Sequence, residues 1–408
     1  MTHDDRPLQP GYRREARPDP EAVGEDAELL ARIRAEIAAG GPITFARFME
    51  RALYEPGHGY YRRPAPGPGL ADGDFLTAPD ADPLFGAAMG RLIEQAWEVL
   101  GRPDPFVVSE PGSGTGALAL GLLGGLRDAG SPLLAAIRYR PVEAEAARIG
   151  AFEDRLRAAG FGPALVLTPP TGPSAEAGAV VANEVIDALP VHRVVMRGGR
   201  LRERFVSVAD GAFSEIEGEP STPALANWAD RLAAGGIVLP EGRVAEVSLA
   251  LDPWLADATA HLARGVVVLV DYGEEAASLY ADRPGREDGT LRTFARHSVG
   301  SDPFRHVGRQ DLTAHVDLTA VRHAAATSGL AHLGSTTQAE MLVAVGAGEL
   351  IATRLRAPGA SLQDALTLRS ALARLMDPRG MGGFAVLAFG RGVPEDADLP
   401  GLQRIRRS

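Results

Sequence analysis

The chain has 408 residues and contains neither cysteine nor lysine. Without cysteine it can form no disulfide, no thiolate metal site and no cysteine nucleophile. Without lysine, the phosphate-binding lysine of a P-loop and a Schiff-base lysine are also excluded. All 42 basic side chains are therefore arginine, and the 53 acidic ones give a formal net charge of −11. This balance argues against a general nucleic-acid binder, which would carry a basic face.

Long hydrophobic runs are missing as well. The longest, ALALGLLGGL at 117–126, is far shorter than the roughly 20 residues that a membrane-spanning helix needs. The first 28 residues are polar, rich in acids and interrupted by proline, with no apolar core of a secretory signal, and their acids are unlike a transit peptide. These features predict a disordered tail over 1–28 and a cytoplasmic protein without membrane insertion.

Strands alternate with helices in the second part of the chain, which we expect to form one domain over 105–408. Apolar runs typical of strands are expected at 106–109, 137–143, 164–168, 179–183, 265–273 and 382–389. Helical patterns lie between the first of these strands, at 117–128 and 144–160. Such alternation predicts an α/β fold with a parallel sheet covered by helices on both faces.

Two segments stand apart from this alternation. Helical spacing at 29–39, 43–54 and 82–100 predicts an N-terminal helical cap over 29–104. The region from about 190 to 250 contains two β-rich runs about Gly198-Gly199, which is a hairpin signal. We expect this insertion to cover the site rather than to join the central sheet.

The stretch SEPGSGTGA at 109–117 follows a short strand and opens a helix. Gly112, Gly114 and Ala117 fit the G-x-G-x-x-G/A pattern of nucleotide-binding loops, although a tight turn alone gives the same match. Glu110 beside this loop would repel a pyrophosphate but attract the ammonium and sulfonium groups of S-adenosylmethionine (SAM). Glu143, at the end of the second strand, could accept hydrogen bonds from ribose hydroxyls. Their other interpretations are a helix-dipole carboxylate for Glu110 and a solvated strand end for Glu143.

Acidic side chains also follow two later strands. Asn183 and Glu184 end one apolar strand and are followed by Asp187, whereas Asp271 and Tyr272 end another. Ligands of open α/β sheets lie at this edge, where two carboxylates could orient a cationic nucleophile and take its proton. A helix cap followed by a turn would explain Asn183 and Asp187 without any chemistry.

His315 and Asp317 lie near the start of a predicted helix. Two candidate ligands are too few for a metal site, and a capping, hydrogen-bonded pair is the alternative. We therefore expect no metal. Thr77 lies in the loop GDFLTAP at 73–79, which on composition alone could be any loop.

Several segments together resemble the MidA-like class I SAM-dependent methyltransferases, a family that includes a mitochondrial protein arginine methyltransferase assisting respiratory complex I assembly. The segments that carry the resemblance are ITFARFMERALYEPGHGYY, GDFLTAPDADPLFG, EPGSGTGALA, ANEVIDALPVHRV, VVVLVDYG, GTLRTFARHSVGSDPF and GRQDLTAHVDLTAV. They occur in this order over roughly residues 29–345. Two positions depart from the family pattern: Gly121 replaces an acid or polar residue, and EAEAAR at 143–148 replaces the motif E-x-S.

The resemblance implies a Rossmann-like class I methyltransferase sheet with an N-terminal helical segment and an inserted β-hairpin cover. It implies SAM as the cofactor and an arginine of a protein, such as a peripheral-arm subunit of complex I, as the substrate. The implied cofactor-binding residues are Thr77, Glu110, Gly112, Gly114, Gly116, Glu143 and Asn183.

For catalysis we expect Glu184 and Asp187 to hold the guanidinium and take its proton, with His315 and Asp317 as helpers. Two other functions stay open from the sequence: an NAD(P)-dependent dehydrogenase using the same glycine loop, and a complex I assembly protein that keeps the fold without the activity. The oligomeric state is also open, with a homodimer as one option.

Overall fold

A computed structural model describes residues 23–63, 77–166, 176–296, 298–356, 359, 361–394, 397 and 399–402. Most of the predicted tail, 1–22, lies outside these residues, as does most of the loop before Thr77. The first helix, α1 (Ala27–Gly40), begins before the predicted Leu29. The reason is a cap, because the Asp26 carboxylate accepts a hydrogen bond from the backbone N–H of Leu29 (3.0 Å).

The main sheet has six strands in the order β15-β16-β9-β4-β2-β3. Their bounds are β2 (Phe106–Pro111), β3 (Ile137–Val142), β4 (Glu176–Asn183), β9 (Leu262–Asp271), β15 (Ala331–Thr337) and β16 (Ala385–Arg391). Strands β3, β2, β4 and β9 are parallel, as predicted. The sheet is not parallel throughout, because β16 runs antiparallel to both β9 and β15. The strand predicted at 164–168 is represented in the described residues by a bridge from Leu165 to Tyr139.

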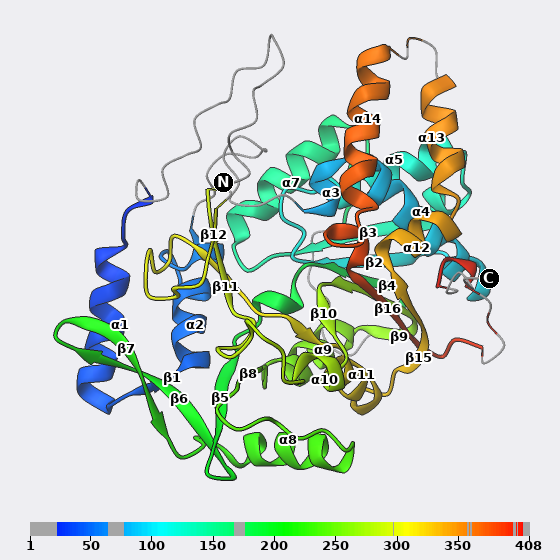
Figure 1. Ribbon diagram of the computed structural model, residues 1–408. Helices are drawn as coiled ribbons and strands as arrows, with labels where there is room; N and C mark the ends of the chain where they lie inside the picture. Colours follow the sequence, from blue (N-terminus) through cyan, green and yellow to red (C-terminus); the bar gives the residue numbers. More distant parts are fainter. Residues whose placement is uncertain are drawn as a thin grey trace, which may run out of the picture.

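Helices cover both faces of this sheet, which confirms the predicted fold class (Figure 1). One face packs against α4 (Pro83–Val99), α5 (Ala117–Asp128), α7 (Ala146–Ala158), α12 (Gln338–Ala344), α13 (Ala347–Arg356) and α14 (Leu362–Leu375). The other packs against α9 (Leu251–Thr259) and α11 (Leu318–Thr327). Successive side chains of β4 point to opposite faces of the sheet, so that Val181 packs with the first group of helices and Val180 with the second. The buried strands therefore read as continuous apolar runs.

The predicted hairpin forms and belongs to a second, antiparallel sheet (Figure 1). Gly198 and Gly199 both have positive φ (58° and 72°), as a two-residue type I′ turn requires. The strands are β1 (Ile43–Thr44), β5 (His192–Arg197), β6 (Arg200–Ala209), β7 (Ala212–Gly218) and β8 (Val244–Val247). Helices α1 and α2 (Phe45–Tyr54) pack against it, and α8 (Pro223–Ala234) lies along it. The Thr44 hydroxyl caps α2 by accepting a hydrogen bond from the Arg47 N–H (3.1 Å).

Shorter elements connect these layers. The short helices are α3 (Ala78–Ala81), α6 (Leu133–Ala136) and α10 (Ala276–Leu279), with 3₁₀ turns at Tyr60–Arg62, Gly162–Ala164, Ile186–Ala188, Met381–Gly383 and Pro400–Leu402. The remaining strands form two small sheets: β10 (Gly273–Glu274) with β14 (Val316–Asp317), and β11 (Arg292–Ala295) with β12 (Ser298–Gly300) and β13 (Asp311–Thr313). They place the segment around His315 beside the end of β9.

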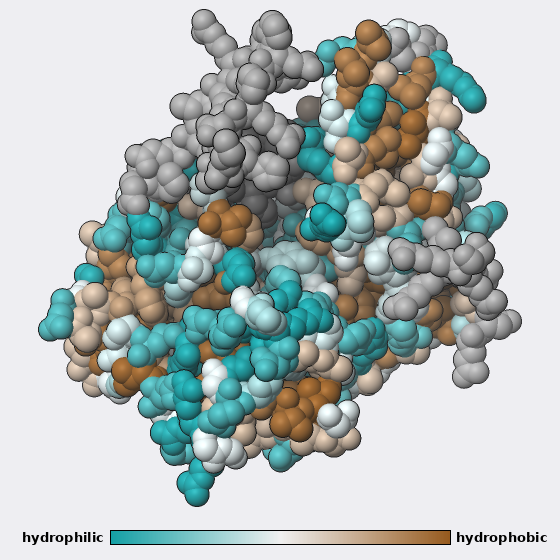
Figure 2. All heavy atoms as spheres, in the orientation of Figure 1, coloured by the Kyte–Doolittle hydropathy of each residue, from teal (hydrophilic) through white to brown (hydrophobic). Residues whose placement is uncertain are grey.

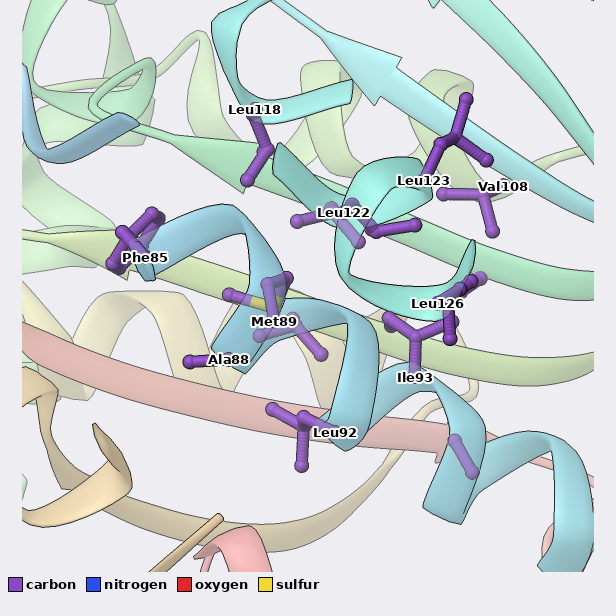
Figure 3. Packing of buried hydrophobic residues seen from close by; sticks show 14 of the residues in the cluster. Phe85, Ala88, Met89, Leu92, Ile93, Val108, Leu118, Leu122, Leu123 and Leu126 are labelled. Atoms are coloured by element: carbon purple, nitrogen blue, oxygen red, sulfur yellow. The ribbon is translucent and has the colours of Figure 1, made fainter. Parts of the chain in front are cut away.

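Helices α4 and α5 pack closely, and Figure 3 shows apolar side chains of α4, such as Met89 and Ile93, beside the leucines of α5. A Cβ atom added to Gly121 would lie 2.9 Å from the Cα of Gly86 and 2.9 Å from the carbonyl oxygen of Pro83. A side chain has no room there, which explains why this position is glycine. The packing also groups α4 with the main sheet rather than with α1 and α2.

This contact predicts opposite effects for two glycines of one helix. Gly121→Ala should lower the free energy of unfolding by about 1–3 kcal/mol, because the new methyl group forces two backbones apart. Gly124→Ala is the matched control, since an added Cβ at that position meets nothing within 4 Å. It should raise stability by about 0.5–1 kcal/mol through helix propensity. Denaturant unfolding measures both, and equal effects would contradict the close-packing explanation.

The surface of the molecule is mixed in character. Figure 2 shows hydrophobic side chains gathered over α13 and α14, where Leu362 and Leu366 are exposed. Within the part of the chain that the structure describes, no helix is both long enough and apolar enough to cross a bilayer.

Candidate active site

The glycine loop joins β2 to α5, and Gly112, Gly114 and Gly116 all have left-handed φ (69°, 50° and 79°). A Cβ atom on Gly112 would lie 2.7 Å from Val185 Cγ2, and one on Gly116 would lie 2.9 Å from the Phe152 ring. Both glycines therefore permit close packing. A Cβ atom on Gly114 would find its nearest neighbour at 3.9 Å, so this side of the loop has room for a ligand.

Glu143 lies against the same loop. Its carboxylate accepts a short hydrogen bond from the backbone N–H of Gly114. The backbone N–H of Gly112 donates to the carbonyl of Val142 (2.9 Å), which fixes the end of β3 beside the loop. Burial raises the pKa of the Glu143 carboxyl. Glu143 is thus a partly buried acceptor at the loop and not a solvated strand end.

Glu110 is buried at the end of β2, where it accepts a hydrogen bond from the Tyr139 hydroxyl (2.6 Å). Burial raises its pKa to about 8, and the neighbouring Glu143 contributes to the rise. Without a bound cation, this carboxyl is therefore mostly protonated at neutral pH. We predicted that a permanently ionised Glu110 would repel a pyrophosphate, and this prediction needs correction. The Glu110 carboxyl becomes ionised when a bound cation stabilises its charged form.

Asn183 and Glu184 meet the short helix α3. The Glu184 Oε1 atom accepts from the Asn183 amide (2.9 Å) and from the backbone N–H of Ala78 (3.3 Å). Burial and the nearby Asp187 raise the pKa of Glu184 to about 8. Thr77 precedes this contact, but its hydroxyl donates to Asp80 (2.7 Å). The buried Asn183 oxygen has no hydrogen-bond partner among the described residues, so a ligand donor could satisfy it.

Asp187 lies on the turn after Glu184. Its Oδ2 atom accepts a short hydrogen bond from the Tyr272 hydroxyl, whereas its buried Oδ1 atom has no such partner in the described ranges. Burial raises the pKa of Asp187 to about 6. Asp271 holds this turn in place, since its Oδ2 atom accepts from the backbone N–H groups of Ile186 (2.9 Å) and Asp187 (3.2 Å). Asp271 is therefore a positioning residue.

His315 and Asp317 approach the site from the segment before α11. The His315 ring lies 5.5 Å from the Tyr272 ring, between centroids, and burial lowers the pKa of His315 to about 4, so it is neutral near pH 7. Asp317 caps α11 by accepting from Ala320 N–H (3.0 Å), and it also accepts from the Tyr280 hydroxyl (3.0 Å). The capping alternative is the one that the structure forms for Asp317.

The sequence interpretation did not identify three side chains of this region, Tyr54, Tyr61 and Asp311. The Tyr54 hydroxyl donates to the Ala188 carbonyl (3.0 Å), and the Tyr61 hydroxyl donates to Asp311 Oδ1 (2.9 Å). The two tyrosine rings are stacked with centroids 5.6 Å apart. Burial and the charges of Asp311 and Asp187 raise the pKa of Tyr54. The usable signal was the group of tyrosines in ALYEPGHGYY, of which Tyr54 ends the predicted helix at 43–54 and Tyr61 lies in the segment that its glycines and proline marked only as a loop.

The site thus combines buried carboxyls, an unsatisfied amide oxygen and aromatic rings at the carboxyl ends of β2, β3, β4 and β9. These acceptors suit a ligand that carries hydroxyls and positive charge. Across the described ranges, no group of three or more His, Cys, Asp or Glu side chains is placed to hold a metal ion.

Comparison with known proteins gives consistent matches. Residues 88–336 match the family model described as "Putative S-adenosyl-L-methionine-dependent methyltransferase". A Burkholderia thailandensis protein solved with bound S-adenosyl-homocysteine is 35% identical, with a TM-score of 0.81, covering 94% of this chain and 96% of that one. The mitochondrial protein arginine methyltransferase NDUFAF7 homolog of Drosophila melanogaster is 29% identical over 90% of this chain and 85% of its own length. Mouse NDUFAF7, also named as a mitochondrial protein arginine methyltransferase, is 26% identical over 89% and 84%.

One expectation is overturned by these relatives. The sequence predicted a cytoplasmic protein, whereas the matched Drosophila and mouse proteins are both named as mitochondrial. The cytoplasmic assignment is therefore wrong. It rested on the composition of the first 28 residues and on the lack of a long apolar run.

Proposed function

Since this chain belongs to the family of putative S-adenosyl-L-methionine-dependent methyltransferases, we propose that it methylates the guanidinium group of an arginine in a protein substrate. The methyl donor is SAM, and neither a dehydrogenase nor a fold without activity is favoured by the family or by the relative bound to S-adenosyl-homocysteine. The observation that carries the proposal is the buried group of carboxyls around Asp187, because a planar cation needs carboxylates that can form paired hydrogen bonds.

The residues at the glycine loop fit SAM. When bound, SAM supplies a methyl group on a sulfonium and leaves as S-adenosyl-homocysteine. We propose that the backbone of Gly112, Gly114 and Gly116 allows the close approach, while Glu143 accepts from the ribose hydroxyls. The remaining proposed contacts are Glu110 with the positive charge, the free oxygen of Asn183, and the backbone at Thr77.

The carboxyls at 184–187 have a defined task in this reaction. A protonated guanidinium has no available lone pair, so one N–H proton must leave as the N–C bond forms and the C–S bond breaks with its electrons going to sulfur. Asp187 is the proposed acceptor of that proton near neutral pH, where a pKa of about 6 leaves it ionised, and the proton then passes to solvent. Glu184, whose pKa is raised to about 8, is the second proposed acceptor, and it becomes ionised when the bound cation favours its charged form. Tyr272 orients Asp187, and Asp271 fixes its backbone. His315 is proposed as a neutral helper beside Tyr272, while Asp317 contributes by capping α11.

The substrate protein is the finer part of the proposal. The matched relatives are named as protein arginine methyltransferases, and this supports a protein rather than a small molecule as the acceptor. Following the resemblance of the sequence motifs, we propose a peripheral-arm subunit of respiratory complex I as the candidate.

The test is transfer of label from methyl-labelled SAM. Purified full-length protein is incubated with isolated complex I peripheral-arm proteins, which are then hydrolysed to amino acids. We expect label to be recovered as methylarginine. Label recovered only in another amino acid, or no transfer while SAM binds normally, would refute arginine methylation. The Glu184→Gln and Asp187→Asn variants serve as controls for background transfer.

A further inference from the structure

Two backbone carbonyls of the turn at 186–188 accept hydrogen bonds from other parts of the fold. The Asp187 carbonyl accepts from the backbone N–H of Ala314 (2.9 Å). The next carbonyl, that of Ala188, accepts from the Tyr54 hydroxyl (3.0 Å). Because Tyr54 is the last residue of α2, the N-terminal helices reach the turn that carries the proposed proton acceptor.

Tyr54 and Ala314 are also connected to each other on a path outside the turn. The Tyr54 ring is stacked on the Tyr61 ring, with centroids 5.6 Å apart, and the Tyr61 hydroxyl donates to Asp311 Oδ1 (2.9 Å). Asp311 begins β13, the strand that leads to Ala314, and α2 packs beside this segment (Figure 1). Tyr54, Tyr61 and Asp311, which we call the tyrosine bridge, thus join the two segments that hold the turn.

The hydroxyl groups of the tyrosine bridge stay protonated at neutral pH. Burial raises the pKa of Tyr54, and the charges of Asp311 and Asp187 raise it further. Burial, again with the charge of Asp311, raises the pKa of Tyr61. Both phenols therefore remain hydrogen-bond donors, and neither can itself produce the lower limb of a pH profile near 6.

Ala188 connects Tyr54 to the carboxylate of Asp187. Burial raises the pKa of Asp187 to about 6, and hydrogen bonds from the Tyr272 hydroxyl and from the backbone N–H of Ala188 limit this rise. Ala188 is thus held at its carbonyl by Tyr54 and at its N–H by the carboxylate. If Tyr54 no longer holds the carbonyl, the hydrogen bond from the N–H weakens and the pKa of Asp187 rises.

Other charges around the turn do not change when this hydroxyl is removed. The titratable groups around Asp187 and Tyr54 come from β3, β4, β9 and the segment 311–317, and they are Glu143, Glu184, Asp271, Tyr272, Asp311 and His315. Replacing Tyr54 by phenylalanine adds no charge and removes none. Its effect on the pKa of Asp187 is therefore transmitted through Ala188.

We propose that Tyr54 and Tyr61 are positioning residues for methyl transfer, because through the Ala188 carbonyl they hold the Asp187 carboxylate where it can take the proton of the guanidinium. The proposal rests on the proposed function. It adds a role for the N-terminal helices in the reaction, since the rate of a transfer between two bound groups depends on their alignment.

The experiment compares Tyr54→Phe with the matched control Tyr280→Phe. Tyr280 is also buried and donates to an acid, Asp317 (3.0 Å), but it lies outside the tyrosine bridge, and Asp317 keeps its cap of α11 without this bond. Single-turnover transfer from methyl-labelled SAM to the peripheral-arm proteins is measured over a range of pH values, and SAM affinity is measured by calorimetry.

We expect Tyr54→Phe to slow transfer about tenfold at neutral pH, with the affinity for SAM within about twofold of the wild type. The lower limb of its pH profile should move upward by about half a pH unit or more, because the pKa of Asp187 rises. Tyr280→Phe should lose thermal stability to a similar extent, while its transfer rate and pH profile stay at the wild-type values.

Tyr61→Phe breaks the same bridge at its other end. It should also slow transfer, and the double variant should be no slower than Tyr54→Phe, since both changes act through one path. If Tyr54→Phe fails to bind SAM, Tyr61→Phe decides by the same readouts.

Three results would overturn the positioning role: a wild-type rate for Tyr54→Phe, slowing without any movement of the pH profile, or losses that multiply in the double variant. Each of these leaves the proposed function intact as long as the wild type forms methylarginine. A wild-type protein that binds SAM and forms no methylarginine refutes the function itself.

Discussion

Asp187→Asn should lower kcat by about 10²–10⁴-fold while leaving the affinity for SAM within about twofold, because it removes a proton acceptor without changing the shape of the site. The variant keeps an oxygen that can accept from the Tyr272 hydroxyl, so the turn at 186–188 should persist. The pKa of Asp187 is about 6 in the folded protein. We therefore expect kcat/KM of the wild type to rise with pH through about 6, and this limb should vanish in the variant.

The control for this prediction is Asp230→Asn, on the exposed face of α8. It changes the net charge by the same amount and should leave both kcat and the pH profile unaltered. Single-turnover transfer and calorimetric binding of SAM separate chemistry from affinity. Retention of wild-type turnover by both Glu184→Gln and Asp187→Asn, with SAM still bound, would show that neither carboxyl takes the proton.

Glu110→Gln should have two opposite effects, stabilising the ligand-free protein and weakening SAM binding. Burial raises the pKa of Glu110 from 4.5 to about 8. A carboxyl whose folded pKa is raised contributes stability that is fully present below 4.5 and is lost as pH rises toward 8. Glutamine cannot ionise, so the variant should exceed the wild type in free energy of unfolding by about 2–4 kcal/mol at pH 8.5, and by little at pH 5.

The same substitution removes the negative charge that a bound cation favours. We expect the affinity for SAM to fall about tenfold or more, and the rise of affinity with pH toward about 8 to become shallower than in the wild type. Glu98→Gln, at an exposed site on α4, should change neither quantity. Thermal unfolding at several pH values and calorimetry provide the readouts. An unchanged SAM affinity together with unchanged stability would mean that Glu110 is neither buried as described nor part of the cofactor site.

Local patterns predicted most of the main fold. The helix at 117–128 and the Gly198-Gly199 hairpin were predictable because their signals are local: apolar spacing, and glycines with positive φ. The antiparallel direction of β16 was not, because strand direction depends on pairing with β9, more than a hundred residues away. Gly121 was noted from the sequence only as a departure from the resembled family pattern, and its contact with Gly86 shows that helix packing requires glycine there.

The site was predicted less completely than the fold. Strand ends located Glu110, Glu143, Glu184 and Asp187, because parallel strands share one functional edge. Their protonation could not be predicted, since it depends on burial by elements distant in sequence. Tyr61 and Asp311 form a pair across 250 residues, a relation that no spacing rule contains. Only the folded structure shows such contacts.

The most direct test is a crystal structure of the protein with S-adenosyl-homocysteine and N-acetylarginine methylamide bound together. Our account predicts the adenosyl ligand at Gly112–Gly116 with its ribose at Glu143, and the guanidinium beside Glu184 and Asp187 with one nitrogen facing the sulfur of the adenosyl ligand. An arginine probe bound away from Glu184 and Asp187, or an adenosyl ligand seated away from the glycine loop, would contradict the account.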